Sequence, residues 1–161
     1  QTAALDLLVK AGCDVNQARS DGMAPAHVAA NKGQTAAFEL LVRAGCDLNQ
    51  ATKDGYTPAH FAAHQGQAAA FELLVRGSTC DVNQATKGGH TPAYTAAERG
   101  MTAVLEILVN AGCDVNQAAN NGTTPALFAA NNGMAAALSR ALAAATLEES
   151  ERQKNKRTEK N

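Results

Sequence analysis

Apolar residues recur along this chain at helical spacing, in segments of two alternating lengths. The longer kind is seen in residues 35–44, where Phe38, Leu41 and Val42 fall on one side and charged residues fall on the other. This spacing predicts an amphipathic helix. A shorter, alanine-rich segment precedes each longer one, as in residues 58–64. The pattern therefore predicts pairs of helices, a short one followed by a longer one, along most of the chain.

Glycine, threonine and proline mark the ends of these segments. A glycine-containing pair suited to a tight turn comes first, at Asp21-Gly22, Asp54-Gly55, Gly88-Gly89 and Asn121-Gly122. Two residues later, a helix N-cap followed by proline at the first helical position is predicted at Thr57-Pro58, Thr91-Pro92 and Thr124-Pro125. The first copy reads Ala24-Pro25 and lacks the capping hydroxyl. The short helix is expected to end at Gly33, Gly66, Gly100 and Gly133.

The whole arrangement repeats with a fixed period. The sequence Cys-Asp-Val-Asn-Gln-Ala, with one Val-to-Leu change, begins at Cys13, Cys46, Cys80 and Cys113, at spacings of 33, 34 and 33 residues. A period of this size indicates a stacked array of similar units. Such an array presents an extended surface, so binding is a more natural function for it than catalysis. The recurring leucine of the longer helices, Leu74 in one copy, is expected to lie in the core.

The repeated unit resembles the ankyrin repeat. The stretches TPAHFAAHQGQ at 57–67 and AGCDVNQ at 111–117 are similar to its TPLHxAAxxGH and GADVN hallmarks. The resemblance covers residues 1–146 and implies an all-α solenoid of antiparallel helix pairs joined by β-hairpin-like loops. It also implies protein–protein recognition on a concave face. The motif leucine is alanine in every copy here, as at Ala59, and its histidine becomes Tyr94 and then Leu127 in the last two copies.

The two ends of the chain depart from the repeat. Residues 1–4 match residues 34–37, so the chain is expected to open within a unit, with a partial first repeat. The pattern fades in the last unit, which we expect to be a capping repeat from about residue 118 with a more polar outer face. Residues 147–161 are predicted to be a polar, charged tail, helical at first and then disordered.

Charge and hydropathy narrow the class of partner. The chain has 14 basic and 15 acidic residues and a net charge of −1, which disfavours nucleic acid as a partner. No apolar run approaches a membrane span, and no signal peptide is recognisable. We expect a cytoplasmic monomer, with the nucleus as the alternative compartment, whose partner is another protein. No cofactor is expected, and the sequence carries no motif of a known catalytic site.

The cysteines and histidines could serve a metal-binding or thiol function, or they could have a purely structural role. Equivalent cysteines in stacked units lie too far apart to form disulfides, so all four are predicted to be free, buried thiols. His60 and His64 have a spacing that can hold a metal, but no third ligand is placed near them. The resemblance implies instead that His60 bonds backbone near the helix start, while His64 is expected to be exposed at the helix end.

The positions that vary between copies give the candidate binding site. They fall at the loop tips and at the ends of the short helices, which in the ankyrin family form the ligand face. The predicted partner-binding residues are Met23, Lys53, Asp54, Tyr56, His64, Gln65, Lys87, His90, Glu98, Arg99, Asn120 and Asn131. Tyr56 is the most promising anchor, because it projects from a turn and is expected to have little to pack against within its own unit.

Three functions are compatible with these observations. The leading hypothesis is a non-enzymatic module that binds a partner protein through its concave face. A second is the substrate-recognition arm of a larger enzyme, such as a ubiquitin ligase or a kinase, with the catalytic domain outside this chain. A third is a thiol or metal-binding protein, for which the cysteine series and the histidine pair are the candidate residues.

Overall fold

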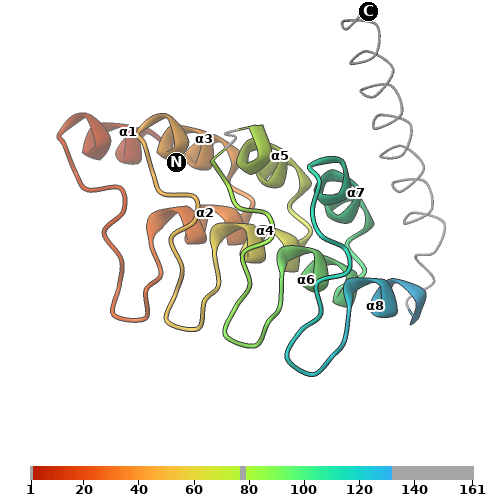
Figure 1. The fold of residues 1–161 in the computed structure, drawn as a ribbon. Coiled ribbons are helices and arrows are strands. Elements are labelled where there is room, and N and C mark those ends of the chain that lie inside the picture. Colours follow the sequence, from red (N-terminus) through yellow and green to blue (C-terminus); the bar gives the residue numbers. More distant parts are fainter. Residues whose placement is uncertain (1, 77–78, 132–161) are drawn as a thin grey trace, which may run out of the picture.

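The computed structural model describes residues 2–76 and 79–131, and within them the chain is all-helical (Figure 1). The helices are α1 (Thr2–Lys10), α2 (Pro25–Lys32), α3 (Thr35–Arg43), α4 (Pro58–Gln65), α5 (Ala68–Arg76), α6 (Pro92–Glu98), α7 (Thr102–Asn110) and α8 (Pro125–Asn131). The described residues contain no strand. The predicted all-α array of paired helices is therefore confirmed.

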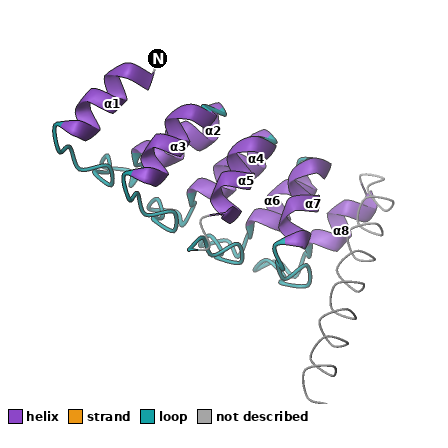
Figure 2. Cartoon of the chain, turned by 90° about the horizontal axis from the view of Figure 1, so that it is seen from above, coloured by secondary structure: helices purple, strands orange, loops and turns teal. Residues whose placement is uncertain are grey.

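The helices form two rows, from which the loops project on one side. The inner row is α2, α4, α6 and α8, and the outer row is α1, α3, α5 and α7 (Figure 1). Neighbours in each row pack on one another, and each of α2, α4 and α6 packs on the outer helix that follows it. Figure 2 shows the pairs succeeding one another along the array, with the loops gathered at one edge.

The inner helices begin at the predicted prolines, and α2 and α4 end at the predicted glycines, whereas α6 ends at Glu98 with Arg99, not the predicted Gly100, as its C-cap. Each starts at a proline, and α2 and α4 end at Gly33 and Gly66, whose φ angles of 62° and 67° are left-handed. Glycine suits this conformation because it has no Cβ to clash. The helix α4 runs one residue beyond the predicted His64, and α3 stops one residue before the predicted Ala44.

Two kinds of cap start the inner helices. In α6 the Thr91 hydroxyl accepts a hydrogen bond from the Tyr94 backbone N–H at 3.1 Å, as predicted for an N-cap. In α2 the N-cap residue Ala24 has no hydroxyl, and the side-chain bond runs the other way: Nδ1 of His27 accepts from the Ala24 backbone N–H at 3.0 Å. The start of α2 therefore keeps the bond from the third helical residue back to the N-cap, but not a side-chain bond from the N-cap into the helix.

Small residues on the inner helices and large ones on the outer helices build the core. The alanines of α4 and α6, such as Ala62 and Ala96, are fully buried, which lets neighbouring inner helices approach closely. Leu74 of α5 is fully buried beside Phe71, and Leu41 and Leu108 occupy the same position in α3 and α7. The predicted core face of the longer helices is confirmed.

Backbone hydrogen bonds fix the loop tips to one another. Within the second loop the Thr52 N–H donates to the Tyr56 carbonyl at 2.9 Å, which gives the predicted hairpin-like turn. Between loops, the Lys53 N–H donates to the Asp21 carbonyl at 2.9 Å. A Cβ on Gly22 would lie 2.8 Å from the Thr52 Cα, so glycine is required there by the neighbouring loop as well as by its φ of 87°. The tips therefore form a connected row.

The Asp and Asn of the repeated motif connect each unit to the next. Oδ1 of Asp47 accepts from the Asn49 backbone N–H at 2.9 Å, which shapes the loop locally. Oδ1 of Asn49 then accepts from the Asp81 backbone N–H of the following unit at 2.7 Å. The same inter-unit bond runs from Asp47 to Asn16 and from Asp114 to Asn83, also at 2.7 Å. The motif recurs because each copy supplies half of a repeated link.

Three sequence-based expectations fall on residues outside the described part of the chain. These are the helix end at Gly133, most of the capping repeat that begins near residue 118, and the polar tail at 147–161. Within the last unit the structure describes the loop and α8, whose N–H at Leu127 donates to the Thr124 hydroxyl at 3.4 Å.

Candidate partner-binding face

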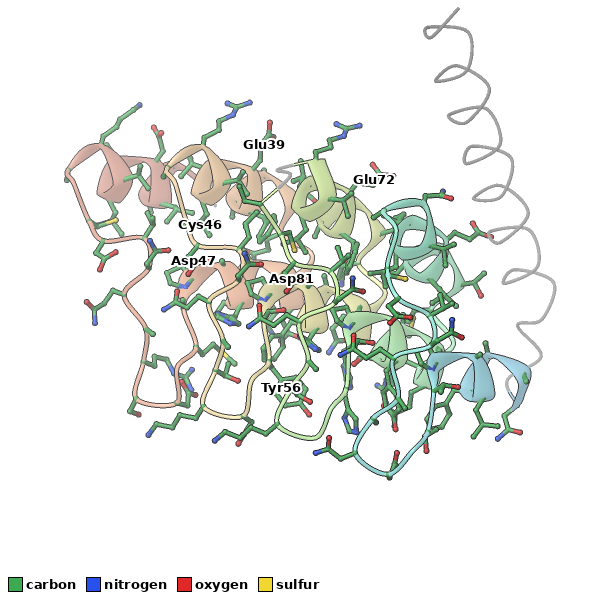
Figure 3. The ribbon with its side chains drawn as sticks, in the orientation of Figure 1. Glu39, Cys46, Asp47, Tyr56, Glu72 and Asp81 are labelled. Carbon is green, nitrogen blue, oxygen red and sulfur yellow. The ribbon has the colours of Figure 1, made fainter. Side chains whose placement is uncertain are left out.

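The loop tips and the inner helices share one side of the array, which we call the loop face. Nine of the twelve predicted partner-binding residues are exposed on it, namely Lys53, Asp54, Tyr56, Gln65, Lys87, Glu98, Arg99, Asn120 and Asn131. Met23, His64 and His90 are half-buried. Tyr56 and Glu72 mark the two sides of the molecule in Figure 3, with Tyr56 on a loop and Glu72 on the outer row.

The ring of Tyr56 is packed against its own unit, contrary to the prediction. It meets His60 nearly edge-on, with ring centroids 5.7 Å apart, and lies tilted against Phe61 at 6.0 Å. The reason is that the hairpin-like turn folds back onto the start of α4. The side chain is nevertheless 37% exposed, so one part of the ring is held while another remains accessible.

A cavity of about 310 Å³ opens beside this aromatic group, between the end of α2 and the length of α4. Its lining residues are Asn31, Tyr56, His60, Phe61, His64 and Gln65. Three of them, Tyr56, His64 and Gln65, were predicted as partner-binding residues. Phe61 was not singled out, because its position is apolar in three of the four copies and resembles a core position; the structure leaves it half-buried.

The histidine of α4 is fixed at both ring nitrogens. Nδ1 of His60 accepts from the Thr57 backbone N–H at 3.1 Å and lies 2.9 Å from the Thr57 hydroxyl. Because Nδ1 is an acceptor, Nε2 carries the proton and donates to the His90 carbonyl at 2.8 Å. His60 therefore joins its own helix start to the next loop, which confirms the structural role implied by the resemblance.

Burial keeps these linking histidines neutral. Burial lowers the pKa of His60 to about 4, although its bond to the His90 carbonyl acts in the opposite direction. Burial also lowers the pKa of His27, whose Nε2 donates to the Tyr56 carbonyl at 3.2 Å. The next two units have Tyr94 and Leu127 at this position and so make no histidine link.

In the third unit, aromatic contacts replace the histidine link. The ring of His90 lies flat on Tyr94, with centroids 4.3 Å apart and planes 2° from parallel. Tyr94 in turn meets Phe128 edge-on at 5.2 Å. His90 was predicted as a partner-binding residue at a loop tip, and the structure places it half-buried, because its ring is stacked on Tyr94.

The histidine pair does not have the geometry of a metal site. Both nitrogens of His60 are engaged by the protein, so His60 and His64 cannot ligate one ion without breaking the Thr57 or His90 bond. Across the described residues there is no group of three or more side chains able to hold a metal. His64 was predicted to be exposed and is half-buried, because it lines the cavity.

The four cysteines are free, as their spacing predicts, but they are less buried than expected. Cys13 is exposed and Cys46, Cys80 and Cys113 are half-buried, because each lies in the loop after an outer helix. Burial, together with the aspartate that follows each residue, raises the pKa of Cys46 and Cys80 to about 11 and of Cys113 to about 12. These three thiols are poorly suited to nucleophilic or redox chemistry at neutral pH.

Charged tip residues differ in whether they have a partner. Arg19 forms an ion pair with Asp21 in the first loop. Lys53, Asp54 and Lys87 are exposed, and they form no ion pair within the described part of the chain. The third loop has Gly88 where the first two have aspartate, so positive charge is concentrated at Lys87.

Comparison with known proteins agrees with this architecture. A family profile for ankyrin repeats in three copies matches residues 1–86 and 75–145. The chain therefore belongs to the ankyrin repeat family, whose members are generally modules of protein–protein interaction. No curated protein gives a significant match to the chain. Among the described residues, no helix has the length and apolar character needed to span a membrane.

Proposed function

We propose that this protein is a non-enzymatic module that binds a partner protein through its loop face, which the resemblance predicts to be concave. The main observation in support is that the repeated residues have structural roles, whereas the residues that vary between units lie on the surface. The repeated Asp, Asn, Gly and Ala residues are used in links, turns and close packing. The residues that vary between units gather on the loop face, where they are mostly exposed.

The rigidity of the tips supports a binding role. Each loop closes on itself and is bonded to its neighbour, as Lys87 is through its N–H to the Asp54 carbonyl at 3.0 Å. A surface that is already ordered loses little conformational entropy when it binds. Tyrosine at its centre adds an amphipathic side chain of the kind that dominates protein interfaces.

Site-specific photocrosslinking tests the proposal. A photoreactive amino acid is placed at Gln65 or Lys87 on the loop face, and at Glu72 on the outer row as the matched exposed control (Figure 3). We expect a discrete crosslinked partner from Gln65 and Lys87, and none from Glu72. Partner crosslinks from Glu72 alone would place the interface on the outer helices and refute the assignment.

A further inference from the structure

We propose that the cavity between α2 and α4 receives one large apolar side chain of the partner, and that the same partner segment carries a carboxylate that pairs with Lys87. This rests on the proposed function and specifies the chemistry of the partner: a short acidic segment with an apolar anchor.

The cavity has the size and lining of an anchor pocket. Its volume of about 310 Å³ corresponds to the space of about ten water molecules, ample for a leucine, methionine or phenylalanine side chain. Tyr56 and Phe61 provide aromatic walls. Asn31 and Gln65 also line it, and their side-chain amides make no hydrogen bond within the described residues. They are free to bond the backbone of a bound segment.

The cavity is preformed because its walls are held from behind. The Tyr56 N–H donates to the Thr52 hydroxyl at 3.1 Å, and the Tyr56 carbonyl accepts from Thr52 and from His27. Phe61 meets His27 edge-on at 5.7 Å. The ring of His60 is fixed at both nitrogens. A partner side chain therefore enters without reordering the wall, which favours affinity.

The orientation of one ring explains why the space is open in this unit. The plane of Tyr56 is inclined by 77° to His60, whereas the equivalent pair in the next unit, His90 and Tyr94, lies parallel within 2°. A stacked pair covers its own faces, but an edge-on pair leaves the face of one ring uncovered. The accessible part of Tyr56 is therefore available to a partner.

Charge at the tips determines what should flank the anchor. Arg19 is neutralised by Asp21, whereas the next two loop tips together hold two lysines, Lys53 and Lys87, and one aspartate, Asp54, which leaves one positive charge without an acidic counterpart at these tips. The Lys87 loop is bonded to the Lys53 loop, so it lies one unit from Tyr56, a separation of roughly 10 Å. An extended peptide covers this distance in about three residues. The carboxylate is expected about three to five residues from the anchor.

A random 12-residue peptide library displayed on phage is the probe, selected on the full chain. We expect enriched peptides to share a large apolar residue with Asp or Glu about three to five residues away. For a synthetic peptide of the most enriched sequence, Gln65→Trp should lower affinity about tenfold or more by filling the cavity mouth. Lys87→Glu should lower affinity several-fold and weaken its salt dependence.

Two control variants test whether the loss of affinity is specific to the cavity and to Lys87. Gln17→Trp places the same bulk on an exposed loop position, and Arg76→Glu reverses an exposed charge at the end of α5; both should bind like the wild type. Circular dichroism and urea denaturation confirm that all four variants are folded. Tight binding of the enriched peptides to Gln65→Trp would overturn the cavity assignment, and selection without a shared acidic residue would overturn the charge assignment.

Three further results would refute the cavity proposal, and one of them would leave the proposed function standing. Failure to enrich any peptide would overturn the inference, which requires recognition of a short segment. Crosslinks to a partner from a photoreactive residue at Lys87 that persist in Gln65→Trp would leave the proposed function standing while refuting the cavity as its anchor. Self-association that Gln65→Trp abolishes would place a second copy of this chain in the cavity and would also overturn the inference.

Discussion

Acidification from pH 7.5 to 5.0 should destabilise this array through His60. In the folded chain its pKa is lowered from 6.5 to about 4, chiefly because the ring is buried and to a lesser extent because His90 and His27 lie near it. In the unfolded chain the ring is solvated and binds a proton near its ordinary pKa of about 6.5. Below about pH 6.5 the unfolded state thus binds more protons than the folded state. The stability of the fold therefore decreases as the pH is lowered towards about 4.

The size of the effect follows from the two pKa values. At pH 5.0 the difference corresponds to about 2 kcal/mol of lost stability, and below pH 4 to about 3 kcal/mol. His27, whose pKa is also lowered by burial, adds a loss of the same sign. The carboxyl of Asp21, whose pKa is lowered by its bond to the Met23 N–H, acts only below its ordinary pKa near 3.8 and so outside this window.

Urea denaturation followed by circular dichroism, at pH 7.5 and 5.0, measures the loss. The variant His60→Gln should be less stable at pH 7.5, because buried bonds are lost, but its stability should fall by about 2 kcal/mol less on acidification. His64→Gln removes a histidine from the same helix and should keep the pH dependence, because His60 remains. An NMR titration in which the His60 ring takes up a proton near pH 6.5 would refute the reasoning, as would equal slopes for His60→Gln and the wild type.

Three further predictions follow from packing and exposure. Leu74→Ala should cost about 2–5 kcal/mol in chemical denaturation, whereas Leu7→Ala, at an exposed position, should cost less than about 0.5 kcal/mol; similar costs would refute the core assignment. In native protein Ellman's reagent should modify Cys13 quickly and the three half-buried cysteines slowly, with four thiols found after denaturation without reductant; fewer than four would indicate disulfides. Tyr56→Ala should lower stability by about 1 kcal/mol, since its ring packs on two others, and should weaken partner binding by about 2 kcal/mol or more; unchanged affinity would remove Tyr56 from the interface.

Much of the fold could be predicted because its signals are local. Proline fixes φ at a helix start. Gly33 can end a helix because glycine, which has no Cβ, adopts a left-handed φ without strain. The apolar period of the longer helices predicts Leu74 to lie in the core, where it is fully buried. The period of 33 to 34 residues then showed that the units stack.

The exposed positions of the loop face could be predicted in outline, because positions that vary among near-identical repeats lie outside the shared framework. The detail of this face could not. The sequence could not show that Tyr56 folds back onto His60, that Phe61 lines a cavity, or that His90 lies in a stack. Each of these depends on a ring in the same or the next unit at a distance and angle that no local pattern encodes.

The amino-acid sequence by itself determined the repeat, the helix ends and the core positions, since these depend on backbone geometry and periodic burial within a unit. Tertiary structure decided what links one unit to the next. The Asn49 side chain finds its partner at Asp81, and the pKa of His60 is set by burial against the following loop. Such properties exist only once units are stacked, because burial and hydrogen-bond geometry belong to the pair of surfaces that meet.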